Sequence, residues 1–319
     1  MLVRSGFQIW PQYQSAAVPR ERFWNSEKAM SSVEGPDFIC AGMVKAGSGW
    51  LYDQLEMHPD FWMPPVKEIV YLGHRDPRLN FARPDSERNP RRRKSEKPRE
   101  RRLNRMRDAR DEQFVEYARG CMGKPMELDR YVGLFAFKGE LLSGDISPTY
   151  NSLKPDIVAD VARRLPDTKI ILLVREPVSR FWSRISMLHR SDNFDESLAH
   201  DATRFRNYLE ESREAQIRPT HVLDMWRTNA PGMQFRSFLF DDIADEPEKT
   251  RREIWTYLGA DPDKPSALPA SHNRKEANKK IAMTDVAQKV LVDFFADEIR
   301  ACGEAFGGRA RDWAARYGL

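Results

Sequence analysis

A short stretch near the start of the chain, residues 37–55 (DFICAGMVKAGSGWLYDQL), most constrains how this protein can fold. Residues 37–43 form a mainly apolar run without a helical period, which predicts a buried strand. A turn with two glycines follows, and residues 50–55 continue at helical spacing. A strand, a glycine turn and a helix in this order form a cradle for an anion, because glycines allow close backbone approach and the first N–H groups of a helix lack internal partners. The simpler alternative is an ordinary turn with a solvated lysine.

The position of the lysine separates this loop from a common class of nucleotide-binding loop. An ATP-binding Walker loop carries its lysine after the last glycine, as GxxxxGK[ST]. Here Lys45 comes two residues before Gly47. This order resembles the phosphosulfate loop of the sulfotransferase family, commonly written PKxGTTxL. Val44 stands where the family has proline, and Gly49 where it has a second threonine.

Three further segments resemble the same family, and they follow one another in the family's order. HPDFWMPPVKEIVYL at 58–72 is similar to the family segment HPxxxMPPxKExxYF, although its Lys-Glu pair taken alone could be a surface pair. GDISPTY at 144–150 resembles a segment beside the acceptor cleft. REPVSRFWS at 175–183 resembles the 3′-phosphate motif RxPxxRxxS, and it follows an apolar strand at 168–174 beside a helix N-terminus.

The order of predicted elements indicates an α/β fold. A strand at 141–146, a helix at 154–165 and a strand at 168–174 form a crossover unit, which makes the sheet parallel and covers both of its faces. Another strand is expected at 235–240, followed by a helix that ends at Gly259. The resemblance implies the P-loop-like sulfotransferase fold, which has a central parallel β-sheet flanked by helices.

The chain is expected to hold one domain with two additions. Residues 1–35 are interpreted as an N-terminal arm, and residues 36–319 as a single sulfotransferase domain with an arginine-rich insertion at about 75–124. Residues 88–112 hold twelve Lys/Arg against five Asp/Glu, whereas the whole chain carries +4. Such a segment either collects an anionic acceptor or nucleic acid, or is a solvated arm that includes a charged helix at 99–119.

The composition of the chain bears on its cellular location and on whether it holds disulfides or metal ions. The sequence has no window of eighteen apolar residues and no signal-peptide core, so we expect a cytoplasmic protein without a transmembrane segment. Three well-separated cysteines and six scattered histidines predict neither a disulfide nor a metal site.

The resemblance implies roles for particular residues. In the family, the phosphosulfate loop binds the 5′ end of 3′-phosphoadenosine 5′-phosphosulfate (PAPS), the 3′-phosphate motif binds its other phosphate, and a glutamate is the catalytic base. The catalytic residues carried over are Lys45, Glu68 and Ser183. Those carried over to bind PAPS are Lys45, Ala46, Gly47, Ser48, Gly49, Trp50, Arg175 and Ser183, with Arg274 and Lys275 from a basic loop that closes over the nucleotide.

The implied activity is transfer of the sulfuryl group from PAPS to a hydroxyl or amine of a carbohydrate, lipid or small metabolite, with 3′,5′-bisphosphoadenosine (PAP) as product and no metal. An anionic carbohydrate or lipid would suit the arginine-rich segment, and nucleic acid is the less expected partner. Two alternatives stay open: a nucleotide kinase, and a catalytically inactive sulfotransferase-like protein that binds polyanions. The sequence does not constrain the oligomeric state.

Overall fold

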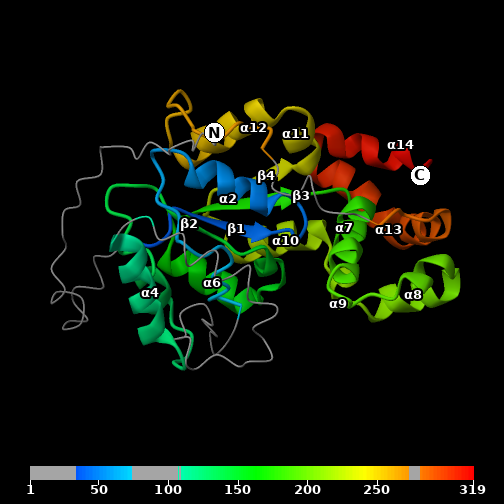
Figure 1. Cartoon of the computed structure of the whole chain (residues 1–319), viewed down its shortest axis with the longest axis horizontal. Coiled ribbons are helices and arrows are strands. Elements are labelled where there is room, and N and C mark those ends of the chain that lie inside the picture. Colours follow the sequence, from blue (N-terminus) through cyan, green and yellow to red (C-terminus); the bar gives the residue numbers. More distant parts are fainter. Residues whose placement is uncertain (1–33, 74–106, 108, 273–280) are drawn as a thin grey trace, which may run out of the picture.

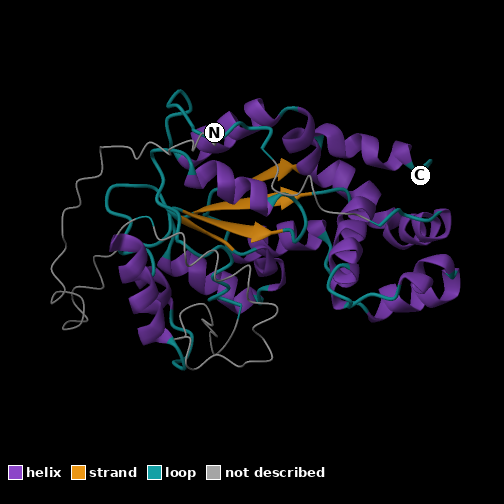
Figure 2. Cartoon of the chain, viewed as in Figure 1, coloured by secondary structure: helices purple, strands orange, loops and turns teal. Residues whose placement is uncertain are grey.

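The centre of the protein is a four-stranded parallel sheet. The computed structural model describes residues 34–73, 107, 109–272 and 281–319. The strand order is β2-β1-β3-β4, and all three pairings are parallel (Figures 1 and 2). The strands are β1 (Phe38–Gly42), β2 (Gly144–Ile146), β3 (Lys169–Val174) and β4 (Phe235–Leu239). This arrangement confirms the predicted α/β fold with a central parallel β-sheet flanked by helices.

The two middle strands account for the apolar runs in the sequence. Every residue of β1 is buried, and five of the six residues of β3 are buried. A strand that is covered on both faces must be apolar along its whole length rather than at alternate positions. Because β1 and β3 are neighbours, the turns that follow them lie side by side at one edge of the sheet.

Helices cover both faces of this sheet. In Figure 1, α2 and α12 lie above it, whereas α6 lies below it and packs against α10. The long helices are α2 (Ser48–Glu56), α4 (Ala109–Cys121), α6 (Pro155–Arg164), α7 (Pro177–His189), α8 (Ala202–Glu211), α10 (Pro219–Asn229), α12 (Pro247–Leu258) and α13 (Asp285–Phe306). The shorter ones are α5 (Leu128–Gly133), η5 (Pro148–Ser152), η6 (Glu196–His200), α9 (Arg213–Gln216), α11 (Phe240–Asp245), η7 (Gly308–Asp312) and α14 (Trp313–Arg316).

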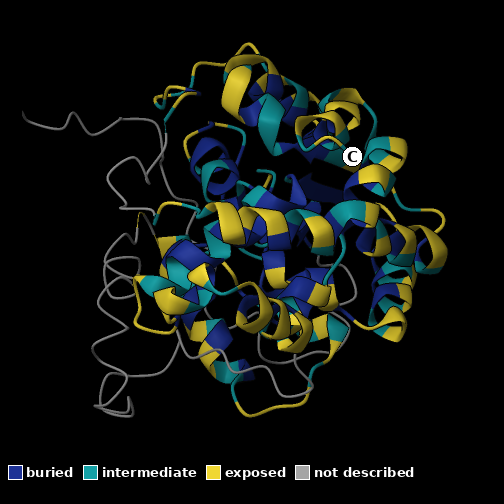
Figure 3. Ribbon diagram, turned by 90° about the vertical axis from the view of Figure 1, so that its right-hand side faces the viewer, coloured by how far each residue is buried: buried dark blue, intermediate teal, exposed yellow. Residues whose placement is uncertain are grey.

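The core lies between the sheet and these helices, whose exposed residues lie on their outer sides (Figure 3). Four tryptophans, Trp62, Trp226, Trp255 and Trp313, are almost completely buried. The predicted end of α12 is confirmed, since Gly259 caps it with a φ of 96°, a left-handed conformation that favours glycine.

The last part of the expected insertion belongs to this core. The predicted charged helix at 99–119 is observed as α4 at Ala109–Cys121, and its Phe114, Val115 and Ala118 are buried. Trp62 donates its indole N–H to Asp111 Oδ1 at 2.9 Å, which fixes α4 to the segment after α2. An apolar stripe at helical spacing therefore outweighs the charge of the surrounding sequence. The rest of the insertion, residues 75–106 and 108, and residues 1–33 of the arm lie outside the described residues.

Two further features are the absence of a membrane-spanning helix among the described residues and the state of the cysteines. Within the described residues, no helix combines the length and the apolar character that a membrane crossing requires. The cytoplasmic location stays a prediction. Cys40, Cys121 and Cys302 are buried free thiols.

Candidate active site

The glycine turn between β1 and α2 is a tight loop that only particular residues can form. Lys45 and Gly47 both have left-handed backbones, with φ of 71° and 106°. A Cβ added at Gly47 would lie 3.2 Å from Ile243 and 3.3 Å from Phe240. Both the conformation and the available space therefore require glycine at position 47.

The N-terminus of α2 is open toward this loop. Gly47 is the N-cap residue, no side chain caps the helix, and its first turn contains no acidic residue. The first N–H groups of a helix have no intrahelical acceptors, and the helix dipole makes that end positive. A Cβ added at Gly49 would meet no atom within 4 Å. The loop therefore fits the phosphate group that the sequence predicts for it.

A second lysine, which the sequence analysis did not assign to the site, reaches the same loop. Lys67 Nζ lies 3.2 Å from Ser48 Oγ and 2.7 Å from Glu68 Oε1, and its side chain is only 11% exposed. This contact joins the loop to the predicted base. The Lys-Glu pair was visible in the sequence. No local pattern indicated that the ammonium group of Lys67 would donate a hydrogen bond to Ser48.

The segment that carries Glu68 is held in an unusual backbone. Glu68 and Val70 have φ of 65° and 55°, and a left-handed conformation is costly for a β-branched residue. Two bonds hold the chain there: Val70 N–H donates to Ser147 Oγ at 2.9 Å, and Leu72 N–H donates to Tyr150 Oη at 3.1 Å. Both acceptors belong to the GDISPTY segment, which therefore positions the Glu68 backbone.

A buried carboxyl group organises that segment. Asp145 accepts hydrogen bonds from Ser147 Oγ and Tyr150 Oη, both at 2.6 Å, and from Tyr131 Oη at 3.2 Å. Burial raises the pKa of Asp145 to about 6, and the three hydroxyl donors partly oppose that rise. Asp145 thus supports the two hydroxyls that hold the Glu68 segment.

Arg175 lies at the neighbouring strand end and contacts the loop directly. Its Nη1 donates to the Lys45 carbonyl oxygen at 3.3 Å, and its guanidinium lies 4.3 Å from the centre of the Phe240 ring. Burial lowers the pKa of Arg175, and the carboxylates of Glu176 and Asp241 oppose this change. The structure thus brings together two of the predicted site residues, from the turns after β1 and β3.

The N-terminus of α7 is already capped by a side chain, contrary to the open helix end expected beside Arg175. Glu176 accepts hydrogen bonds from the N–H groups of Val178 and Ser179 at 2.6 and 2.8 Å, and Tyr317 Oη donates to it at 2.9 Å. An anion at this turn must therefore be held by side chains. Ser183, the predicted partner of Arg175, lies on α7 and is partly buried.

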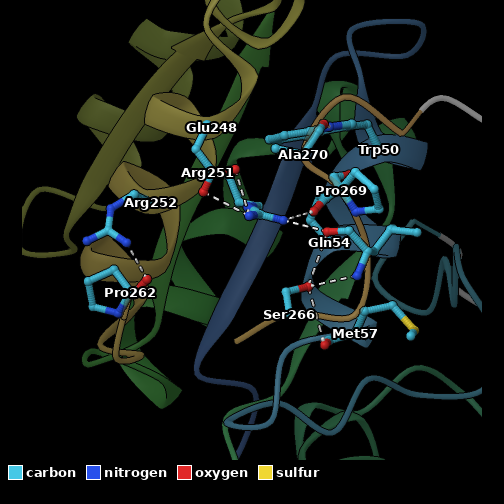
Figure 4. Close-up of polar contacts among 11 residues, drawn as sticks. Trp50, Gln54, Met57, Glu248, Arg251, Arg252, Pro262, Ser266, Pro269 and Ala270 are labelled. Atoms are coloured by element: carbon cyan, nitrogen blue, oxygen red, sulfur yellow. Dashed lines mark hydrogen bonds and ion pairs between the residues drawn. The ribbon is translucent and has the colours of Figure 1, made fainter. Parts of the chain in front are cut away.

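Helix α2 also anchors a distant segment of the chain (Figure 4). Trp50 donates its indole N–H to the Ala270 carbonyl at 2.6 Å, and Gln54 donates its amide to the Pro269 carbonyl at 3.0 Å. Arg251 completes the group by donating to Gln54 Oε1 at 3.0 Å. The indole of Trp50 therefore holds this segment, and the binding of PAPS by residue 50 stays a prediction.

The predicted basic loop continues from there. On its far side, Trp182 donates its indole N–H to the Ile281 carbonyl at 3.0 Å. The described residues on either side of 273–280 are therefore attached to α2 and α7. Arg274 and Lys275 themselves lie outside the described residues, so their role stays a prediction. Within the described residues, no group of three or more His, Cys, Asp or Glu is arranged to hold a metal ion.

Comparison with known proteins agrees with this geometry. A sequence profile described as "Sulfotransferase family" matches residues 36–264. The chain belongs to the sulfotransferase family. No curated protein sequence is significantly similar to this sulfotransferase.

Solved structures share its fold. A sulfotransferase from Alicyclobacillus acidocaldarius superposes with a TM-score of 0.58 at 22% identity, covering 88% of this chain and 99% of the other. The sulfotransferase domain of the Synechococcus PCC 7002 olefin synthase covers 90% of this chain and 96% of its own length, at 18% identity and a TM-score of 0.45. The first of these confirms the predicted sulfotransferase fold.

Proposed function

We propose that this sulfotransferase moves the sulfuryl group from PAPS to a hydroxyl or amine of an acceptor, and releases PAP. The observation that carries the proposal is the contact between Arg175 and the Lys45 carbonyl, 3.3 Å apart. It brings the uncapped N-terminus of α2 and the Arg175 guanidinium to one edge of the sheet. A donor that carries phosphate groups at both ends of its ribose requires such a pair of sites, whereas ATP does not.

The loop residues would bind and neutralise the reacting end of the donor. The open N-terminus of α2 and the Ser48 hydroxyl hold the 5′-phosphate, and Lys45 stabilises the charge that develops on the departing oxygen. Lys67, in contact with Ser48 and Glu68, adds positive charge beside the same oxygens. Arg175 and Ser183 hold the 3′-phosphate, with the guanidinium as a two-pronged donor.

Glu68 would act as the base. Its side chain is 46% exposed and its carboxylate is oriented by Lys67, so an acceptor can approach it. Glu68 takes the proton of the acceptor hydroxyl while the acceptor oxygen forms its bond to sulfur. The bond between sulfur and the bridging oxygen breaks, and that oxygen leaves as part of the PAP phosphate.

Ligand-induced stabilisation tests the donor. PAP at a hundred times its dissociation constant should raise the free energy of unfolding by about 2.7 kcal/mol, while ATP with Mg²⁺ should have little effect. Stabilisation by ATP with Mg²⁺ alone would instead identify a nucleotide kinase. Binding of PAP without PAPS turnover on a broad acceptor panel would support the catalytically inactive, polyanion-binding alternative.

Substitution of the base tests the chemistry. Glu68→Gln should abolish turnover of PAPS and leave the affinity for PAP unchanged, because Glu68 faces the acceptor rather than the nucleotide. Glu140→Gln, a change at an exposed glutamate, is the matched control and should retain full activity. Loss of PAP binding by Glu68→Gln would show that Glu68 is structural.

A further inference from the structure

A cavity of about 430 Å³ lies beside the candidate active site, between η5, α7 and the α8–α9 segment. Since η5 follows β2 and α7 follows β3, it is at the same edge of the sheet as the phosphosulfate loop. Its size falls within the range of about 300–1,000 Å³ that is typical of small-molecule sites. Its lining includes Thr149 of the GDISPTY segment and Arg184, the residue after Ser183.

The charges in this cavity are mainly positive. Arg184 and Arg213 line it, and neither forms an ion pair within the described part of the chain. Arg184 Nε is buried and has no hydrogen-bond partner among the described residues. The carboxylate of the described lining, Glu214, is already paired with the fully buried Arg180 at 3.2 Å. These two guanidinium groups, which have no carboxylate partner among the described residues, favour an anionic ligand.

The remaining lining suits a hydroxylated ring. Asn151 is only 6% exposed, and its side-chain N–H₂ has no partner among the described residues. Thr149, Ser152 and Ser212 contribute hydroxyl-bearing side chains to the lining, and Tyr208 and the almost fully buried Phe181 contribute aromatic ones. Aromatic faces pack against the apolar face of a ring, while hydroxyl and amide groups exchange hydrogen bonds with its substituents.

We propose that this cavity receives the acceptor, and that the acceptor is a small sugar that carries one anionic group, either carboxylate or phosphate. Arg184 and Arg213 bind the anionic group, and the sugar ring packs between η5 and α7. The proposal rests on the sulfotransferase function proposed above and names the substrate class for the same site.

Paired ligands that differ in a single anionic group test this assignment. The full-length protein is loaded with PAP, and calorimetry compares phenyl glucuronide with phenyl glucoside, and glucose phosphate with glucose. The preferred anionic member should bind about tenfold or more tightly than its neutral partner, which corresponds to one charge-assisted contact. Its identity distinguishes a carboxylate from a phosphate acceptor.

Arg184→Gln should abolish this preference without changing the affinity for PAP. Arg213→Gln, an exposed and structurally mild change, should reduce the preference by several-fold. Arg163→Gln, at a side chain that is 76% exposed on α6, is the control and should have no effect. Equal affinity for charged and neutral ligands, failure of the anionic ligands to bind, or a preference that survives both cavity variants overturns the proposal. Failure of PAP itself to bind would instead refute the proposed donor.

Discussion

The two turns at the edge of the sheet have the same topology but offer different groups to an anion. After β1, the chain turns through Gly47 into α2, whose N-terminus has no side-chain cap. After β3, the chain turns directly into α7, whose N-terminus is capped by Glu176. The first turn can therefore bind phosphate with backbone N–H groups, whereas the second relies on side chains such as Arg175.

This difference shows that a strand followed by a helix is not by itself an anion site. Glu176 satisfies the N–H groups that would otherwise face a ligand, and its negative charge lies next to Arg175. A backbone site favours any phosphate group, while a side-chain site can be selective for one position of the ligand. In this sulfotransferase, discrimination between PAPS and other nucleotides is expected to reside in the second turn.

The largest effect is expected in the first turn, at the lysine. Lys45→Ala should reduce turnover of PAPS by about a hundredfold or more, because one preorganised charge that stabilises the departing oxygen is lost. Initial rates of PAP formation measure this, with Lys289→Ala at an exposed position of α13 as the control. Retained activity would count against the proposed role of the loop.

A smaller, ligand-dependent effect is expected in the second turn. Arg175→Ala should weaken PAP binding by about thirtyfold, since a charge-assisted bidentate contact is removed. AMP, which has no 3′-phosphate, should bind as before. Calorimetry with both ligands separates the outcomes, because an equal loss for AMP and PAP would mean that Arg175 acts through its contact with the Lys45 carbonyl.

Changing the residue that caps α7 should alter how strongly the second turn attracts an anion. Glu176→Gln removes the negative charge beside Arg175 and leaves one of its hydrogen-bond donors without an acceptor. We expect about 1–2 kcal/mol lower stability in urea unfolding, together with PAP affinity that is about threefold higher. Weaker PAP binding by the folded variant would contradict the second expectation.

The smallest effect is expected where the first turn departs from the family pattern. Gly49→Thr should tighten PAP binding by about twofold, because it supplies a hydroxyl where an added Cβ meets no atom within 4 Å. Gly49→Ala should stabilise α2 slightly without improving PAP binding. Equal affinity of the Thr and Ala variants for PAP would show that no phosphate oxygen lies near position 49.

Much of the fold was accessible from sequence because local patterns specify it. The apolar runs of β1 and β3, the spacing of α6 and the glycine after α12 each depend on neighbouring residues. Strand β2 is shorter than the predicted 141–146, because Leu142 pairs with Phe61 in an isolated bridge rather than extending the strand. That pairing involves a segment far away in the sequence, so no local pattern could predict it.

The candidate site was predicted only in part. Motif order predicted roles for Lys45, Glu68 and Arg175, which stay predictions, and it missed the cap formed by Glu176 and the contact of Lys67 with Ser48. A glutamate before a proline gives little sign of whether it faces solvent or folds back onto its own helix. The burial of Glu176, at 2% exposure, is decided by its surroundings, which include Tyr317 from the end of the chain.

The sequence by itself determined the parallel α/β architecture and the position of the glycine loop, since hydrophobic periodicity and turn chemistry act over a few residues. Only the tertiary structure decided that Arg175 meets the Lys45 backbone, 130 residues away, and that Lys67 joins the loop to Glu68. Such contacts depend on which strands become neighbours and on how their helices pack. Strand order and helix packing depend on residues throughout the core, so no single segment of the sequence specifies these contacts.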